Sequence, residues 1–246
     1  MDERTKNNPL GNQPVGALMM KFAIPSIVAM MVSAIYNLVD QIFIGNYVGY
    51  LGNAATNIAF PLAMSCTAIG LLFGIGGASC FNLTMGRGYP DKAIYYIGNA
   101  VTSLITCGII LALIVELTLS GLLNAFGSPA DVLAIGFPFL ILAIGGGHLI
   151  RADGSPTMAM VCNMSGAILN IFLDALFIIV FKMGMTGAAL ATIIGQMFSA
   201  VLVILYMRRF KTVKLEGKHF IPEFSLLKMI AGIGAASFFN QLAMMI

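Results

Sequence analysis

The sequence contains no tryptophan, only two histidines and few charged residues, since 9% of its 246 residues are Asp, Glu, Lys or Arg. An average soluble domain carries about 25% charged residues, whereas 59% of this chain is hydrophobic. This composition excludes a water-soluble globular domain. Alternating segments of about ten residues, which mark membrane β-barrels, are absent as well. The remaining class is a protein built from membrane-spanning helices.

The cysteines, histidines and glycines form no recognised catalytic or metal-binding pattern. All four cysteines, at positions 66, 80, 107 and 162, lie in apolar runs without CxxC spacing, which indicates neither a disulfide framework nor a zinc site. His148 and His219 belong to no HExxH motif, so an intramembrane enzyme is disfavoured. The glycine clusters 74–77 and 145–147 lack the GK[ST] ending of a phosphate-binding loop, and we interpret them as close helix contacts. We expect no organic cofactor and no structural metal.

Polar or Gly/Pro-rich breaks divide the chain into six apolar spans and the beginning of a seventh. Each of the six can cross about 30 Å of hydrocarbon as a helix. The first is too long for a signal-peptide core and is predicted to be retained. The expected spans are 17–44, 54–84, 93–123, 132–150, 157–181, 187–207 and 225 onward. The predicted fold class is therefore all-α: a polytopic membrane protein with a six-helix transmembrane bundle plus the start of a seventh helix.

The basic residues predict how these helices are oriented. If the N-terminus is cytoplasmic, twelve of the thirteen basic residues lie on the cytoplasmic side, as the positive-inside rule requires. These twelve are Arg4, Lys6, Lys21, Arg87, Lys92, Arg151, Arg208, Arg209, Lys211, Lys214, Lys218 and Lys228, and the opposite side holds only Lys182. We expect a multi-pass protein of the cytoplasmic (plasma) membrane. The same loops account for the net charge of +3 without nucleic-acid binding, because no soluble domain offers a basic groove.

The spans and loops predict four segments. They are a cytoplasmic N-terminal tail (1–16), a six-helix transmembrane lobe (17–207), a basic cytoplasmic inter-lobe loop (208–224) and the start of a second lobe (225–246). The chain ends inside its seventh apolar run, before that run is long enough to complete a span, so we expect a fragment of a longer protein. The openings of the first and seventh spans, residues 18–23 and 226–231, are faintly alike, as they would be in two repeated halves.

Polar side chains form stripes at helical spacing on several spans. The stripes comprise Ser33, Tyr36, Asn37 and Asp40 in the first span, Asn99, Ser103 and Thr106 in the third, Asn163, Asn170 and Asp174 in the fifth, and Thr192, Gln196 and Ser199 in the sixth. Intramembrane Asn, Ser and Thr often only bridge helices, through hydrogen bonds that average about 0.6 kcal/mol. This structural reading is favoured for the third-span stripe and for Ser199.

The two aspartates in these stripes favour a functional reading. An ionised aspartate at a helix centre costs about 2.5 to 3.5 kcal/mol even on the lenient insertion scale, so Asp40 and Asp174 are expected to face each other or a water-filled cavity. Burial disfavours the charged form, and such a group can gain and lose a proton during a working cycle. Neighbouring Asn and Thr oxygens also suit a hard cation such as Na⁺. Glu116, near the outer end of the third span, is expected to reach the headgroups.

Four motifs, in this order, resemble the N-terminal lobe of a multidrug and toxic compound extrusion (MATE) transporter. They are IYNLVDQIFIG in the first span, the RADGSP loop, NIFLDALFI in the fifth span and GAALATIIGQ in the sixth. The resemblance implies an antiporter of two helical lobes that exports drug-like, often cationic compounds by alternating access. It implies a cation- or proton-coupling site of Asp40, Asn170, Asp174 and Thr192, with Tyr36 near the substrate cavity. We assign Asn37, Asn163 and Gln196, from the same stripes, to that cavity.

The resemblance also sets what the protein requires. The coupling ion would be H⁺ or Na⁺, the partners would be small organic substrates and membrane lipid, and the rocking motion would need a C-terminal lobe that this chain lacks. The fourth span departs from the family, which usually has roughly ten more residues after the SP turn, so a shorter outer end is expected. Two alternatives remain: a lipid-linked oligosaccharide flippase of the same superfamily, which would favour a basic cavity, and a half-transporter that does not transport.

Overall fold

The structure is a computed structural model that describes residues 14–118, 121 and 130–244. Its elements are the helices α3 (Val15–Phe43), α4 (Tyr50–Gly86), α5 (Pro90–Thr118), α7 (Ala130–Ala152), α8 (Pro156–Asp174), α9 (Gly184–Met207) and α10 (Phe224–Ala243), the π-helical turns η1 (Ile44–Val48) and η2 (Ala175–Val180), and the 3-10 turn η3 (Gly217–Phe220). Within the described residues, seven helices are long and apolar enough to cross a membrane. The predicted all-α membrane fold is confirmed.

The observed helices begin and end close to the predicted spans. The fourth, predicted as 132–150, is α7 with 23 residues, which is shorter than α5 with 29. The seventh helix, predicted only as a beginning, already has 20 residues, and this length is sufficient for a span because a helix rises about 1.5 Å per residue. The tail up to residue 13 and most of 119–123, at the predicted end of the third span, lie outside the described residues.

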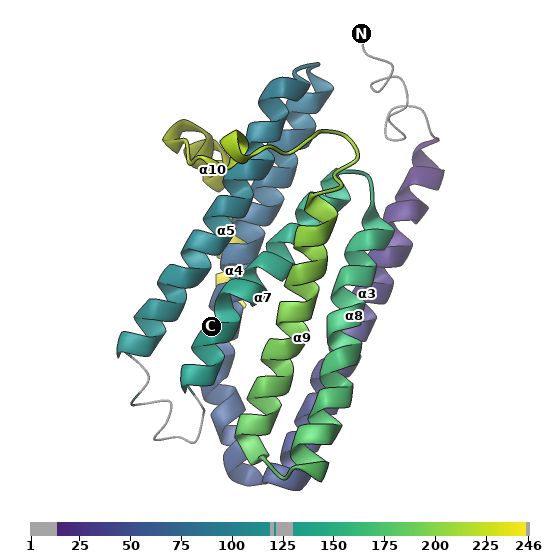
Figure 1. Cartoon of the computed structure of the whole chain (residues 1–246). Coiled ribbons are helices and arrows are strands. Elements are labelled where there is room, and N and C mark those ends of the chain that lie inside the picture. The colour runs from purple at the N-terminus through teal and green to yellow at the C-terminus, as the bar shows by residue number, and fades with distance from the viewer. Residues whose placement is uncertain (1–13, 119–120, 122–129, 245–246) are drawn as a thin grey trace.

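The connections between helices alternate between the two ends of the bundle (Figure 1). Those between α4 and α5, α7 and α8, and α9 and α10 lie at the end where α3 begins, and those between α3 and α4 and between α8 and α9 lie at the opposite end. The end where α3 begins carries Arg87 just after α4, Arg151 in the last turn of α7 and Arg208 just after α9. We call it the basic end. Lys182, between η2 and α9, lies at the other end.

Glycines allow α4 to approach two neighbouring helices. A Cβ atom on Gly74 would lie 2.6 Å from Cα of Gly145 on α7, and one on Gly234 of α10 would collide with the backbone of Leu72. In a bilayer, where lipid is as apolar as a leucine side chain, such close backbone packing replaces the hydrophobic effect in holding helices together. The interpretation of both glycine clusters as helix contacts is confirmed.

Helix α3 lies at the edge of this bundle and packs against α8 (Figure 1). The main core is formed by α4, α5, α7 and α9, with fully buried side chains such as Phe81, Ile97 and Ile141. Of the residues in α3, only Ala29 is buried. Helix α3 is therefore an outer wall, and the side that faces α8 carries Tyr36 and Asp40.

The linker between α9 and α10 (residues 208–223) is fastened to the bundle by Asp153 of the α7–α8 turn. Asp153 is 5% exposed; its Oδ2 accepts hydrogen bonds from the Tyr206 hydroxyl at 2.7 Å and from the Lys211 backbone N–H at 2.9 Å. Its Oδ1 accepts from the backbone N–H of Thr212 at 2.9 Å and from the Thr212 hydroxyl. The next residue, Gly154, has φ of 75°, a conformation that glycine adopts without strain and that lets the chain reverse here.

The second half of the linker lies on α5. The Thr102 hydroxyl donates to the Phe220 carbonyl at 2.8 Å, and the Glu223 backbone N–H donates to Asn99 Oδ1 at 2.7 Å. Asn99 therefore holds the linker, in agreement with the structural reading of its stripe. The linker is thus bound to the first lobe near both of its ends.

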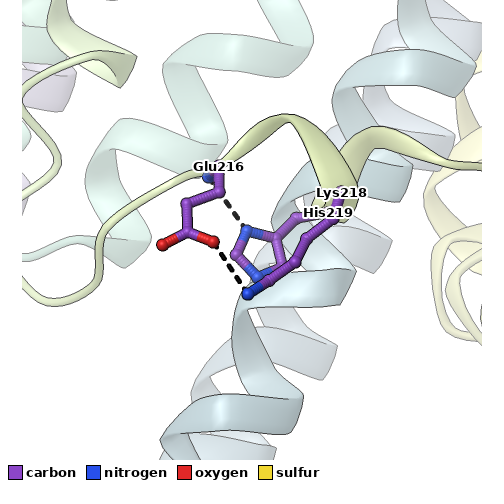
Figure 2. A network of polar contacts seen from close by, with 3 residues as sticks. All are labelled: Glu216, Lys218 and His219. Atoms are coloured by element: carbon purple, nitrogen blue, oxygen red, sulfur yellow. Dashed lines mark hydrogen bonds and ion pairs between the residues drawn. The ribbon is translucent and has the colours of Figure 1, made fainter.

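A local network shapes the 3-10 turn of the linker (Figure 2). The Glu216 backbone N–H donates to Nδ1 of His219 at 3.0 Å, and Lys218 forms an ion pair with Glu216 at 2.7 Å. The His219 ring also meets Tyr95 edge-on, with 4.8 Å between ring centroids. Hydrogen bonding to Lys218, and its charge, lower the pKa of the exposed Glu216 and in return raise the pKa of Lys218. Such an exposed pair adds little stability.

We expect Asp153→Ala to release the linker. The substitution leaves four donors without their charged acceptor, and hydrogen bonds to charged groups contribute about 1.5 to 3 kcal/mol each, although not additively. Limited trypsin digestion of the chain in detergent should therefore cleave at Arg208, Arg209 and Lys211 at least about tenfold faster, because local opening becomes easier. Glu216→Gln, which removes an exposed linker carboxylate, should leave cleavage at these sites unchanged. Equal rates for Asp153→Ala and the parent chain would show that the linker is held by other contacts.

Candidate functional site

The two aspartates of the polar stripes lie where their helices change geometry. Asp174 is the last residue of α8, is fully buried at 0% exposure, and is followed directly by the π-helical turn η2. Asp40 lies four residues before the π-helical turn η1, which continues α3. π-helical turns are rare and often occur at functional sites. Hydrophobic periodicity indicates only that a helix continues, so sequence reasoning missed both turns.

The packing of α3 on α8 brings the two carboxyl groups together with Tyr36. Asp40 and Asp174 lie within range for their charges to interact, and Tyr36 lies within range of both. Among the described residues, Oδ1 of Asp40 and Oδ1 of Asp174 are buried and have no hydrogen-bond partner. A buried polar atom without a partner is costly, and two neighbouring carboxylates repel each other. A bound proton or small cation would relieve both costs.

Asn170 connects Asp174 to the neighbouring helix α9. It is 3% exposed and lies one helical turn before Asp174. In one orientation its amide nitrogen donates to Oδ2 of Asp174 at 3.1 Å, while its oxygen accepts from the Thr192 backbone N–H at 3.1 Å. In the other orientation its nitrogen donates to the Thr192 hydroxyl at 3.4 Å. The first orientation satisfies both ends of the amide. The predicted coupling residues Asp40, Asn170, Asp174 and Thr192 are thus in one place.

A glycine contact between α8 and α9 brings Asn170 of α8 close enough to reach Thr192 of α9. A Cβ atom on Gly195 would lie 2.7 Å from the Gly166 carbonyl oxygen and 3.1 Å from Cβ of Asn170. One turn along, the Ser199 hydroxyl donates to the Cys162 carbonyl at 2.9 Å. Ser199 therefore bridges the two helices, as the structural reading of this residue predicts, and the pair of glycines lets Asn170 reach Thr192.

The three remaining predicted cavity residues are not among the contacts described above. Asn37 is exposed and donates to the Ser33 carbonyl of its own helix at 2.7 Å. Gln196 reaches α7, where its Oε1 lies 3.1 Å from the position of a Cβ atom on Gly136. Asn163 is half-buried on α8, seven residues closer to the basic end than Asn170. The structure thus assembles Tyr36 with the four coupling residues, and the assignment of Asn37, Asn163 and Gln196 to the substrate cavity stays a prediction.

An apolar cluster lies just beyond the carboxyl groups, toward the end that carries Lys182. Ile44 of η1, Ile178 of η2 and Ala188 of α9 are buried together, and Phe43, Val48 and Met185 pack against them. The two π-helical turns contact each other in this cluster. These side chains offer no hydrogen bonds to water or ions, so the site has an apolar cluster on this side.

The ligand set of the site suits a proton or an alkali cation. Carboxylate, amide and hydroxyl oxygens are the ligands that hard cations prefer, whereas thiolates and imidazoles select transition metals. Within the described residues there is no group of three or more His, Cys, Asp or Glu side chains that could hold a metal ion. The oxygens of Asp40, Asp174, Asn170 and Thr192 would be the ligands for Na⁺, or the two carboxyl groups the carriers of H⁺.

An all-helical, multi-pass membrane bundle with buried carboxyl oxygens between two of its helices has the construction of a membrane transporter. The family model MatE matches residues 25–176, which is more than half of the chain. The chain therefore belongs to the MatE family, a family of transporters rather than enzymes. The predicted family is confirmed.

Individual relatives agree with this assignment. The chain is 29% identical over 235 residues to the multidrug export protein MepA of Staphylococcus haemolyticus, covering 89% of this chain and 51% of that protein. It is 26% identical over 242 residues to MepA of Staphylococcus aureus, covering 94% and 54%. A crystal structure of a MATE mutant has the same fold, with a TM-score of 0.87 at 24% identity, and covers 96% of this chain and 55% of that chain. The chain thus spans about half the length of the relatives it matches.

Proposed function

We propose that this chain forms the N-terminal half of a cation-coupled exporter of drug-like, often cationic organic compounds. Its relatives in two staphylococci are named multidrug export proteins, and the chain matches about half of each. The proposal includes the four predicted segments: the tail 1–16, the six-helix lobe 17–207, the inter-lobe loop 208–224 and the start of a C-terminal lobe at 225–246. The rest of that second lobe would be the partner for alternating access.

We further propose that the basic end faces the cytoplasm, with the N-terminus on that side. Ten described basic residues support this orientation, because they lie at or near helix ends or in the linker on the basic end: Lys21, Arg87, Lys92, Arg151, Arg208, Arg209, Lys211, Lys214, Lys218 and Lys228. Positive charge of this kind is retained on the cytoplasmic side. The apolar cluster of η1, η2 and α9 then lies on the outer side of the coupling site.

The observation that carries the proposed mechanism is the pair of buried, unpartnered carboxyl oxygens on Asp40 and Asp174. Without an ion, the two charges repel across the α3–α8 contact. A proton or Na⁺ entering from outside removes the repulsion and lets α3 close on α8, which reduces the space and negative charge available to a bound organic cation. The cation leaves outward, and loss of the coupling ion to the cytoplasm resets the lobe. Coupling arises because ion and drug compete for the same charges.

The test is transport in proteoliposomes that contain this chain completed by its second lobe. An imposed H⁺ or Na⁺ gradient should drive a fluorescent lipophilic cation uphill, and collapse of the active gradient should abolish the movement. Drug addition should in turn release the coupling ion, because binding linkage is reciprocal. Uphill movement of the dye that is indifferent to both gradients would refute cation coupling. Movement of a lipid-linked oligosaccharide, with none of the organic cation, would establish the flippase alternative instead.

A further inference from the structure

A second polar site lies at the basic end, away from the coupling aspartates. A groove of about 220 Å³ runs between α3, α4 and α7. Its polar lining consists of Ser79 and Asn82 on α4 and of His148 and Arg151 on α7, and Phe22 and Ile75 supply apolar walls. The two polar pairs are each three residues apart, so each pair lies on one helix face. A positive charge, neutral donors and an apolar wall therefore meet in one groove.

The guanidinium of Arg151 has no acidic partner in this groove. Within the described part of the chain, no carboxylate lies within the 4.0 Å that defines an ion pair with it. Its Nη1 lies 3.8 Å from the position that a Cβ atom on Gly147 would take, so the side chain runs back along α7 instead of extending into the following loop. Arg151 is one of the residues that line the groove, so its donors are available to a ligand there.

The position of the groove along the bundle axis limits the kinds of ligand that can reach it. Arg151 lies in the last turn of α7 and Phe22 in the second turn of α3, so the groove is at the height where a spanning helix leaves the hydrocarbon. Arg87 and Lys92 belong to the same end, and basic residues near a membrane surface attract anionic lipids. The apolar walls suit a ligand with a hydrocarbon part, which inorganic phosphate does not have.

We propose that this groove binds the headgroup of an anionic phospholipid from the leaflet at the basic end. The Arg151 guanidinium takes the phosphate with two parallel N–H bonds, a geometry that lysine cannot supply. Ser79, Asn82 and His148 offer further donors, and an acyl chain lies along Phe22 and Ile75. The lipid then ties α3, which has few buried residues of its own, to α4 and α7. This role is independent of the exported substrate and of the coupling ion.

The proposal predicts selective lipid retention by the purified 246-residue chain. Native mass spectrometry in mild detergent, with added phosphatidylglycerol or phosphatidylcholine, should show preferential binding of phosphatidylglycerol. Arg151→Gln should lower that binding at least about tenfold, because the phosphate loses charge-assisted hydrogen bonds as well as a nearby positive charge. Arg87→Gln, which removes one positive charge from an exposed residue at the same end, should change it much less.

A second variant distinguishes lipid binding in the groove from attraction of the lipid by positive charge alone. Ser79→Leu narrows the groove while Arg151 remains, and it should also reduce phosphatidylglycerol binding. Thermal unfolding without added lipid checks that each variant is folded, and the parent chain should gain thermal stability from phosphatidylglycerol but not from inorganic phosphate. Equal lipid binding by the parent chain, Arg151→Gln and Ser79→Leu would overturn the proposal. Equal stabilisation by inorganic phosphate would do so as well, because it would assign the groove to a soluble anion.

Discussion

Replacing Asp174 with asparagine should abolish gradient-driven export by the complete transporter while leaving the protein folded. Asparagine keeps the shape of the side chain but can neither release a proton nor contribute a negative charge to bound Na⁺. The drop in export should be at least about tenfold, which corresponds to roughly 1.4 kcal/mol in the coupled step. The measurement is initial efflux of an organic cation under an imposed H⁺ or Na⁺ gradient.

The same substitution should not lower the thermal stability of the protein. Asp174 is fully buried and one of its carboxyl oxygens has no partner, so removal of its charge also removes a desolvation cost. Glu116→Gln is the matched control, because Glu116 is a half-buried carboxylate on α5, outside the α3–α8 contact. Export by Asp174→Asn at the parent rate would show that this carboxyl group does not couple transport. Loss of export together with unfolding would instead assign Asp174 a structural role.

Substituting Gly195 with alanine should separate α8 from α9 and destabilise the whole lobe. The added methyl group would lie 2.7 Å from a backbone oxygen, that of Gly166, and a backbone atom inside a packed helix cannot rotate away as a side chain can. Overpacking of this kind costs about 1 to 3 kcal/mol. We expect the midpoint of thermal unfolding in detergent to fall by about 5 °C. Export should fall as well, since Asn170 loses its short contact with Thr192.

The control for this prediction is Gly16→Ala, the same chemical change in the first turn of α3. No atom lies within 4 Å of the new methyl group there, and alanine favours a helix over glycine by about 1 kcal/mol. This variant should therefore unfold at the parent temperature or slightly above it. If Gly195→Ala also unfolded at the parent temperature, the glycine contact would not be what holds the two helices together.

The sequence alone predicted the parts of this protein that depend on local composition. Hydropathy predicted the spans because each helix must be apolar over the thickness of the bilayer, whatever its neighbours are. Spacing selected Asp40, Asn170, Asp174 and Thr192 because an unpaired carboxyl group in lipid is too costly to be incidental. The structure brings these four residues together.

The cavity assignment of the neutral polar residues stays a prediction. Asn37, Asn163 and Gln196 share the spacing of the coupling residues, but Asn37 donates to the backbone of its own helix and Gln196 reaches α7. Periodicity assigns a residue to a helix face but does not determine which neighbour covers that face. An amide or hydroxyl is cheap enough to be satisfied by its own backbone, so its presence in a span carries less information than a carboxylate does.

Composition and periodicity therefore determined that this chain is a bundle of membrane helices with an acidic pair inside it. Only the tertiary structure decided that α3 packs on α8 at the edge of the bundle. It also decided that π-helical turns follow the two aspartates, that Asp153 holds a linker more than fifty residues away, and that Arg151 faces a groove. Each of these features depends on contacts between residues distant in the sequence. Such contacts depend on small residues that allow particular helix backbones to approach each other. The pattern within one helix does not show which other helix will pack against it.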